Sequence, residues 1–507
     1  MRAKSGLVPD CDVHGEPMYL AECPGSVFGL ANRDIHVWRC AREDCDRYFY
    51  GTVGYRYTME ANGTAQTPRC ASEGAFLVAQ QSLGLYVCPV DGCNTIRPWM
   101  LREQTKSYKG KNKGKVVAAM ASVHAPQLFT RPPEEEPRQL DAGIAAMREL
   151  GKVLDQTRPD ALIIVASDHM ETFFLRTVPT FAIMAGDRAT AAFAGRTWGP
   201  AIHQPLAEAL LEQLVRRDFD IAYSQDADLG HSFAAIFEWI LEDRAIQVVP
   251  VLVNTYLPPL PSPRRCAALG RAIAEIVAKC PERVAVLASG GMSNYPGTAR
   301  YYEPAYDFDR WCIHELENSH EDSFLYVTPE QLDEVGNTEM LPWAVALGAI
   351  GKQHMELISY QPTTHHGHAV VRFHPGAKNA AEPSRPYTFD SHPYHFYNHP
   401  PLTAYKLNKL LYDSRFKPTL RVRLLQEPDA VAREYDLTAE QTGALLESLT
   451  FRHLNTAKAG NDAEALVKVG AHPIGALMAM HGLQQEKRSQ KRAAAVATGV
   501  TAELVAR

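Results

Sequence analysis

The 507-residue sequence has no excess of positive charge and no long apolar segment. Its formal net charge is -6 at pH 7, whereas proteins that bind nucleic acid non-specifically usually carry a basic excess. No stretch of about 20 apolar residues could span a bilayer, and the opening residues MRAKSGLVPDCD lack the apolar core of a signal peptide. We therefore expect a cytoplasmic protein with neither nucleic acid nor a membrane as a partner.

The cysteines are concentrated at one end of the chain. Seven of the ten precede residue 94, in a sequence without an export signal, so bound metal explains them better than disulfides. The other three, Cys266, Cys280 and Cys312, lie in apolar or helix-like surroundings and are expected to be buried thiols.

An internal duplication organises these early cysteines. The segment that starts at Cys11 and includes His14 is echoed by the segment that starts at Cys70, where Glu73 takes the place of His14. Each copy is followed by an aromatic-x-Cys-x4-Cys pair, and two such turns can close a tetrahedral zinc site. The repeat resembles a pair of zinc ribbons with a structural Zn(II) in each. The expected ligands are Cys11, His14, Cys40 and Cys45 in the first copy and Cys70, Cys88 and Cys93 in the second.

Changes in composition divide the rest of the chain. The lysine- and glycine-rich run KSYKGKNKGK is typical of a flexible linker, and a Pro- and His-rich stretch marks a second boundary. At a typical size of about 100–200 residues per domain, the length predicts several domains. We expect a zinc-ribbon-like pair over 1–105, a linker over 106–115, a catalytic domain over 116–376, a linker over 377–400, a helical cap over 401–485 and a tail over 486–507.

Strand-like and helix-like runs alternate between residues 116 and 375. The apolar runs VVAAMASV, ALIIVAS, IQVVPVLV and RVAVLAS are separated by runs with helical periodicity, such as QPLAEALLEQLVRRD. This alternation predicts an α/β fold in which helices cover a mostly parallel or mixed central sheet. Beyond residue 401, runs such as LTAYKLNKLLYDSRF and TAEQTGALLESL predict an all-α cap, and the small cysteine-containing pair before the sheet is expected to be β-rich.

Four histidines are the candidate functional residues of the α/β region. His124 follows the first apolar run and His169 follows the second, and catalytic groups of open α/β sheets gather beyond the carboxyl ends of strands. Two imidazoles and one carboxylate form the facial arrangement of non-haem Fe(II) oxygenases. Asp307 or Glu303, which come after the fourth apolar run, could supply the carboxylate.

Four motifs resemble, in order, those of the class III extradiol dioxygenases, typified by protocatechuate 4,5-dioxygenase and gallate dioxygenase. The motifs are Ser122-Val-His124-Ala-Pro, Ser167-Asp168-His169, Gly199-Pro-Ala-Ile-His203 and Gly290-Gly291-Met292-Ser293. The segment 401–485, with Leu407-Asn408, resembles the small helical partner subunit of the same enzymes, fused here after the catalytic part.

This resemblance implies an Fe(II)-dependent enzyme that opens a catechol-like aromatic ring with O2. It implies iron ligation by His124, His169 and Asp307, with Glu303 as the alternative, acid–base catalysis by His231 and a pocket role for His203. Thr364 is a candidate substrate contact on position alone, and a homodimer is the expected assembly.

Three positions depart from the family pattern. Asp307 stands where the family has a glutamate, His231 is displaced in register, and Asn294 stands where a histidine often follows Gly-Gly-x-Ser. The same fold could therefore act on an aminophenol or heteroaromatic diol, or catalyse metal-assisted hydrolysis. A third possibility is an inactive, zinc-ribbon-bearing binding or assembly protein.

Overall fold

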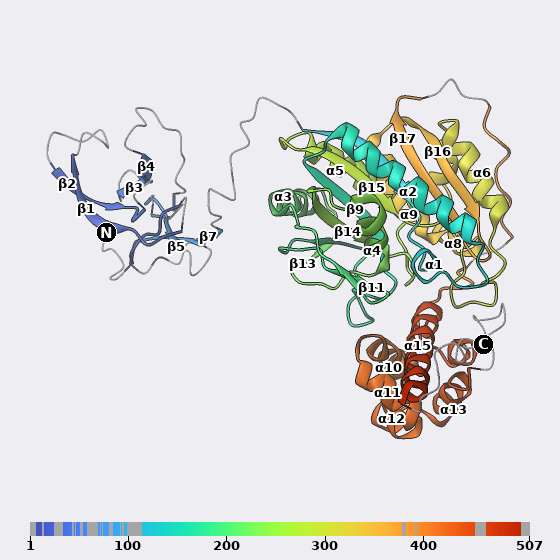
Figure 1. Cartoon of the computed structure of the whole chain (residues 1–507). Coiled ribbons are helices and arrows are strands. Elements are labelled where there is room, and N and C mark those ends of the chain that lie inside the picture. The colour runs from blue at the N-terminus through green and yellow to red at the C-terminus, as the bar shows by residue number, and fades with distance from the viewer. Residues whose placement is uncertain are drawn as a thin grey trace. The chain divides into compact units, whose positions relative to one another are not determined.

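The chain divides into two compact units, residues 1–111 and 112–507, in a computed structural model (Figure 1). Each unit is described by itself. The structure describes residues 114–377, 382–390, 393–451 and 463–497, together with shorter stretches between residues 7 and 98. Among these residues, no helix is long and apolar enough to cross a bilayer.

The first unit contains two small antiparallel sheets, one for each cysteine repeat. The first sheet has the order β1-β2-β3-β4 and the second the order β5-β6-β7. Equivalent bridges, Asp10 to Pro17 and Arg69 to Phe76, precede them, so the internal duplication is also structural. The strands are β1 (Tyr19–Pro24), β2 (Asp34–Arg39), β3 (Arg47–Tyr50), β4 (Gly54–Tyr57), β5 (Val78–Gln80), β6 (Leu85–Val87) and β7 (Ile96–Pro98).

An eight-stranded mixed sheet forms the centre of the second unit, in the order β13-β10-β14-β9-β15-β8-β17-β16. Its four middle strands are parallel and coincide with the four predicted apolar runs: β8 (Lys115–Ser122), β9 (Ala161–Ser167), β14 (Gln247–Val253) and β15 (Arg283–Ser289). The remaining strands are β10 (Phe181–Met184), β13 (Ile221–Ser224), β16 (Gln353–Pro362) and β17 (Gly367–Pro375), while β11 (Ala191–Phe193) and β12 (Arg196–Trp198) form a separate hairpin.

Helices cover this sheet. The long helix α2 packs against β8, β16 and β17, whereas α9 packs against β8, β9, β15 and the neighbouring helix α5 (Figure 1). The middle strands are buried on both faces, which explains why their sequences are continuous apolar runs rather than alternating ones. The helices of this region are α1 (Gln127–Thr130), α2 (Pro137–Thr157), α3 (Gln204–Val215), α4 (His231–Ile236), the π-helix η3 (Phe237–Leu241), α5 (Pro263–Val277), α6 (Tyr306–Glu317), α7 (Glu321–Leu325), α8 (Pro329–Glu334), the 3-10 helix η4 (Thr338–Met340) and α9 (Leu341–Ile350).

The C-terminal segment is helical, as predicted, and has its own core of leucines and alanines together with Val431, Phe451 and Met480. It belongs to the same compact unit as the sheet. Its elements are η5 (Leu402–Ala404), α10 (Tyr405–Phe416), α11 (Pro418–Gln426), α12 (Pro428–Glu434), α13 (Ala439–Ser448), α14 (Glu464–Lys468) and α15 (Pro473–Ala497).

Three details differ from the expectations. Lys115, assigned to the linker, is the first residue of β8, and the rest of that run except Gly114 lies outside the described residues. The tail begins inside α15, which continues to Ala497. The Pro- and His-rich stretch packs on the sheet region, because the backbone N–H groups of His395, Phe396 and Tyr397 donate to the carboxylate of Asp333.

Candidate active site

Three histidines meet at the carboxyl ends of the parallel strands. The side-chain nitrogens of His124, His169 and His231 that could bind a metal lie within 4.8 Å of one another, and all three side chains are buried. His124 follows β8, His169 follows β9 and His231 begins α4. The sequence analysis expected the first two at strand ends and His231 in the same site, and the structure brings all three side chains together.

A carboxylate that the sequence analysis missed lies beside two of these histidines. Glu339, in η4, has its Oε2 3.3 Å from Nε2 of His124 and its Oε1 2.9 Å from Nε2 of His169. Glu339 is 1% exposed. The sequence did contain one indication that Glu339 has a specific role, because it stands just before the wholly apolar helix α9. A carboxylate in such a buried setting needs specific partners.

Glu339 is held from several sides. Its Oε2 accepts a hydrogen bond from the backbone N–H of Gly291 at 2.8 Å, and its Oε1 accepts from the hydroxyl of Tyr256. Burial alone would raise the pKa of Glu339, but the facing imidazoles of His124 and His169 bring it well below its usual range. The group is therefore an anion in a buried place.

The hydrogen bond of His124 fixes which of its nitrogens faces this anion. The Ser289 hydroxyl donates to the carbonyl of Ser232 at 2.5 Å, so its oxygen must accept from Nδ1–H of His124, 3.0 Å away. Nε2 of His124 then carries a lone pair, and this buried nitrogen has no hydrogen bond within the described structure. A lone pair and a carboxylate oxygen that face each other at 3.3 Å fit a shared cation.

His231 is oriented by a second carboxylate. Oε2 of Glu171 lies 2.9 Å from Nδ1 of His231 and also accepts from its backbone N–H at 3.1 Å. Because a carboxylate only accepts, Nδ1 of His231 carries the proton and Nε2 is left as an acceptor. Gly230 makes this contact possible, since a Cβ there would lie 1.6 Å from Oε2 of Glu171.

Burial keeps His169 neutral. Removal from water, together with the neighbouring His231, lowers the pKa of His169 to about 4 despite the opposing effect of Glu339. Neutral imidazole is the form that binds metals. The donor set is therefore two imidazoles and a carboxylate, with a third imidazole adjacent.

Both carboxylates proposed from the sequence lie elsewhere. Asp307 is in the first turn of α6 and accepts a hydrogen bond from the hydroxyl of Tyr387 at 2.7 Å. Glu303 is exposed and lies 3.8 Å from Arg300. The carboxylate that does lie beside the two imidazoles, Glu339, comes from η4, further along the chain than the Gly-Gly-Met-Ser loop.

His203 is also outside the group. It caps the N-terminus of α3, where its Nδ1 accepts from the backbone N–H of Leu206 at 3.2 Å. Its backbone N–H donates to Val248, five residues before the end of β14 at Val253, a distance along the strand of about 17 Å. Thr364 contacts Glu134 and Glu135 through its hydroxyl and backbone N–H, so no described contact joins it to the histidines.

Asn294 lies at the edge of the histidine group. Its Nδ2 is 3.4 Å from Oε1 of Glu339 and 3.1 Å from Nε2 of His366. The loop that carries it is fixed by buried Asp309, which accepts from the backbone and the hydroxyl of Ser293 at 3.0 and 2.8 Å. The residue beside Glu339 at this position is therefore an amide, in place of the histidine expected from the family pattern.

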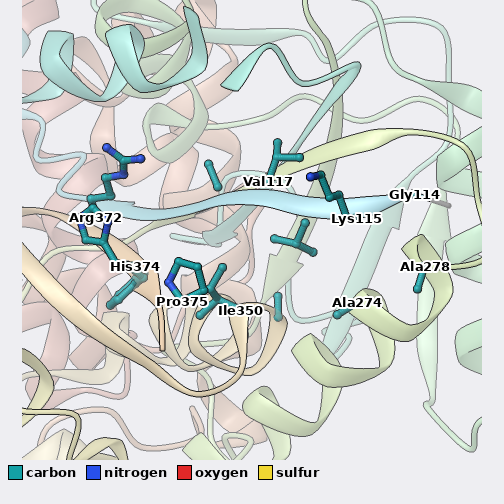
Figure 2. A pocket seen from close by; sticks show the side chains of 13 residues that line it. Gly114, Lys115, Val117, Ala274, Ala278, Ile350, Arg372, His374 and Pro375 are labelled. Atoms are coloured by element: carbon teal, nitrogen blue, oxygen red, sulfur yellow. The ribbon is translucent and has the colours of Figure 1, made fainter. Parts of the chain in front are cut away.

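A surface hollow at the other end of the sheet is unrelated to this site. Figure 2 shows that it is lined by Gly114 and Lys115 at the start of β8 and by Arg372, His374 and Pro375 at the end of the antiparallel β17. His124 lies beyond the opposite end of β8.

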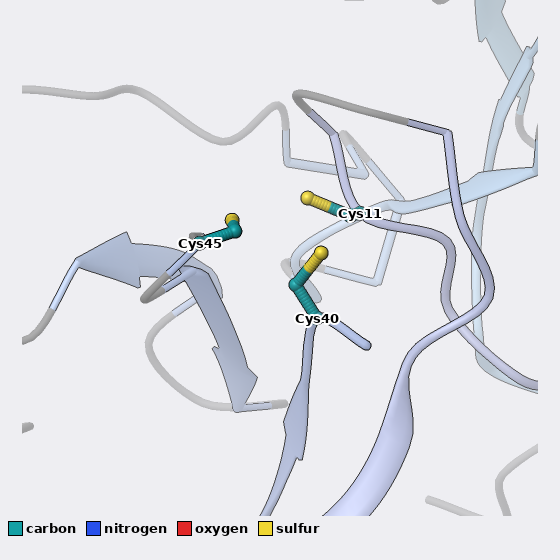
Figure 3. Close-up of side chains that lie close together, drawn as sticks. All are labelled: Cys11, Cys40 and Cys45. Atoms are coloured by element: carbon teal, nitrogen blue, oxygen red, sulfur yellow. The ribbon is translucent and has the colours of Figure 1, made fainter. Parts of the chain in front are cut away.

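The cysteines of the first unit form two further groups. Cys11, Cys40 and Cys45 lie with their sulfurs within 4.8 Å of one another and directed toward a common space (Figure 3), and Cys70, Cys88 and Cys93 are grouped in the same way. His14 lies outside the described residues. Glu73 donates its backbone N–H to the sulfur of Cys70 at 3.4 Å. Both repeats therefore contain residues that could hold a metal.

Comparison with known proteins agrees with this geometry. Residues 118–373, about half of the chain, match the family described as the catalytic LigB subunit of aromatic ring-opening dioxygenase. The chain belongs to this family.

Several relatives of this chain carry the name 2,3-dihydroxyphenylpropionate/2,3-dihydroxicinnamic acid 1,2-dioxygenase. One, from Rhodococcus sp, is 28% identical over 187 residues, which are 36% of this chain and 59% of the relative. Another, from Burkholderia vietnamiensis, is 36% identical over 146 residues, 28% of this chain and 45% of the relative. The chain thus spans about half the length of the curated relatives it matches.

A solved structure of an uncharacterized protein from Escherichia coli K12 aligns with 45% of this chain and 91% of its own, at a TM-score of 0.35 and 18% identity.

Proposed function

We propose that the protein is an extradiol dioxygenase that uses Fe(II) and O2 to open a catechol-like ring. The observation that carries the proposal is the convergence of Nε2 of His124 and Nε2 of His169 on the buried carboxylate of Glu339, whose oxygens lie 3.3 and 2.9 Å from these nitrogens. These three residues would hold the iron in the two-imidazole, one-carboxylate arrangement of non-haem oxygenases. When bound, Fe(II) would bring the diol and O2 together and supply the redox chemistry.

The histidine group offers a different ligand set, His124, His169 and His231. We favour Glu339 over His231 because the carboxylate reaches both other ligands and offsets the charge of a divalent cation, whereas Nδ1 of His231 is already committed to Glu171. His231→Gln distinguishes the two sets. It should retain iron if Glu339 is the third ligand and lose it otherwise.

His231 is then free to act as the acid–base residue. Its Nε2 lone pair can accept the proton of a substrate hydroxyl. Nδ1–H remains hydrogen-bonded to Oε2 of Glu171, and the negative charge of this carboxylate stabilises the imidazolium that forms. Asn294 cannot perform this step, because an amide does not exchange a proton near neutral pH. We propose that proton transfer depends on His231.

The substrate class is also a proposal. The relatives are named for diols that carry a carboxylated side chain, and the motif resemblance extends to protocatechuate and gallate enzymes. We propose a carboxylated aromatic diol. O2 uptake and ring-opened chromophores should be recorded for Fe(II)-reconstituted protein with 2,3-dihydroxyphenylpropionate, protocatechuate, gallate and 2-aminophenol.

Matched variants make this test specific. His124→Ala should abolish both iron binding and turnover, whereas Asp307→Asn, which removes an exposed carboxylate outside the group, should retain both. Bound iron without O2 uptake on any diol would contradict the dioxygenase proposal, and hydrolysis of an ester or amide in the absence of O2 would favour the hydrolytic alternative.

We also propose a structural Zn(II) in each cysteine repeat. Burial first, and then the adjoining thiols Cys93 and Cys70, raise the pKa of Cys88 to about 11, so without a cation Cys88 would remain a thiol. Metal analysis should find up to two zinc ions per chain, and Cys40→Ser should remove one. Cys266→Ser, which changes a buried thiol in α5, is the control.

A further inference from the structure

A guanidinium from the C-terminal helical segment is buried against the active-site loop. Arg415, on α10, has a side chain that is 7% exposed. Its Nη1 donates to the carbonyls of His169 and Met170, at 3.2 and 2.9 Å, and its Nη2 lies 3.6 Å from Oε1 of Glu171. Residues separated by about 245 positions in the chain therefore share one buried charge pair.

Glu171 uses its two oxygens for different partners. Oε1 faces Arg415, while Oε2 accepts from Nδ1 and from the backbone N–H of His231. Burial by itself would raise the pKa of Glu171, but His231 and then Arg415 reverse this and lower it to about 2. Among the described residues, Arg415 is the only arginine or lysine within ion-pair distance of this carboxylate.

The two contacts of Arg415 have a geometric consequence. The carbonyl contacts fix the guanidinium on the loop that follows β9, and the charge pair fixes the rotation of the Glu171 carboxylate on that same loop. That rotation decides whether Oε2 faces Nδ1 of His231. Loss of the guanidinium would leave Oε1 of this buried carboxylate without its charged partner, so that only the contacts of Oε2 with His231 would oppose rotation of the carboxylate.

We propose that Arg415 is a positioning residue of the active site: it holds Glu171 in the rotamer that keeps Nε2 of His231 directed at the iron centre. The helical segment is then part of the catalytic apparatus and more than a cover over it. This inference rests on the proposed dioxygenase function only for its kinetic readout, because the Glu171–His231 geometry exists without substrate or metal.

The kinetic experiment uses full-length, Fe(II)-reconstituted protein. Arg415→Met should lower kcat about 10- to 100-fold, the usual effect of removing a group that orients a ligand or catalytic residue, and leave KM within about twofold. Arg415→Lys should recover part of the loss. Arg423→Met is the control, because Arg423 pairs with Glu427 and Glu434 on the exposed face of the same helical segment and should retain wild-type kcat.

A double-mutant cycle separates positioning from general stability. If Arg415 acts through Glu171, Arg415→Met combined with Glu171→Gln should be no slower than the slower single variant. Wild-type kcat in Arg415→Met, or losses that multiply in the double variant, would overturn the proposal. If Arg415→Met does not fold, the same cycle is run with Arg415→Lys, and independence from Glu171→Gln would likewise overturn it.

A measurement that does not depend on turnover tests the positioning role of Arg415 even if the protein is not a dioxygenase. In metal-free protein labelled with ¹⁵N-histidine, the His231 ring should give the signals of a fixed Nδ1–H tautomer, assigned through His231→Gln. Arg415→Met should shift or average these signals, and Arg423→Met should not. Unchanged signals in Arg415→Met would refute the positioning role, whereas absence of turnover in the wild-type protein with the signals shifted as expected would refute only the dioxygenase proposal.

Discussion

The packing of the helical segment on the sheet region should weaken at acid pH because of His472. This residue precedes α15, is 1% exposed and donates from Nε2 to the carbonyl of Tyr256 at 2.8 Å. Its backbone N–H donates to Oδ1 of Asn408 at 2.8 Å, which fixes the backbone of this residue against α10. Protonation would place a charge in this buried contact.

The size of the effect follows from the two pKa values. Burial, with a smaller contribution from His399, lowers the pKa of His472 to about 4, against about 6.5 in an unfolded chain. Between these values the open state, in which the helical segment has separated from the sheet region, therefore binds more protons than the packed state. The contribution of His472 to the packing free energy is complete above pH 6.5 and is lost as the pH falls toward 4. Between pH 7 and pH 5 the loss amounts to about 2 kcal/mol.

Hydrogen exchange of the α15 amides at pH 7, 6 and 5, corrected for intrinsic exchange rates, measures this opening free energy. His472→Gln keeps a side-chain N–H donor but cannot titrate. Between pH 7 and pH 5, the opening free energy of this variant should therefore decrease by about 2 kcal/mol less than that of the wild type. His354→Gln, on β16, is the control for a histidine outside the contact. Equal pH dependence in wild type and His472→Gln would refute the reasoning.

Three further outcomes are expected. Glu339→Gln should reduce iron affinity at least tenfold, measured by equilibrium titration with Fe(II), because the amide cannot replace the carboxylate charge; unchanged affinity would exclude Glu339 as a ligand. Gly230→Ala should lower kcat more than tenfold with iron retained, since its Cβ would displace Glu171; wild-type turnover would show that the Glu171 contact is dispensable. Asp309→Asn should lower the thermal midpoint by several degrees in calorimetry, because this buried carboxylate also accepts from Tyr360 at 2.8 Å; an unchanged midpoint would contradict a role in fixing the Ser293 loop.

The fold was predictable in its essentials because each middle strand is buried on both faces. A strand buried on both faces is apolar along most of its length, so β9 (ALIIVAS) and β15 (RVAVLAS) can be recognised in the sequence without knowledge of their neighbours. The same local logic placed His124 and His169, which directly follow such strands. The cysteine repeat was recognisable for another reason, because the same pattern of cysteines occurs twice in the sequence.

Tertiary structure decided which carboxylate lies beside the two imidazoles. Glu339 is 170 residues from His169 in the sequence, and only the packing of η4 under the Gly290–Gly291 turn brings its carboxylate to the two imidazoles. Asp307 lies nearer to the family motif in sequence, yet α6 directs it to Tyr387. Proximity to a motif along the chain carries little information where the connection between two strands contains several helices.

The sequence by itself determined the four middle strands, the two histidines at the ends of β8 and β9, the duplicated cysteine pattern and the helical character of the C-terminal segment, because each follows from a local or repeated pattern of residues. The tertiary structure alone decided which carboxylate joins those histidines, that Glu171 orients His231, and that Arg415 from the helical segment faces Glu171. The physical reason is that a buried charge is stabilised by partners that converge in space, and nothing local in the sequence specifies which distant segments will converge.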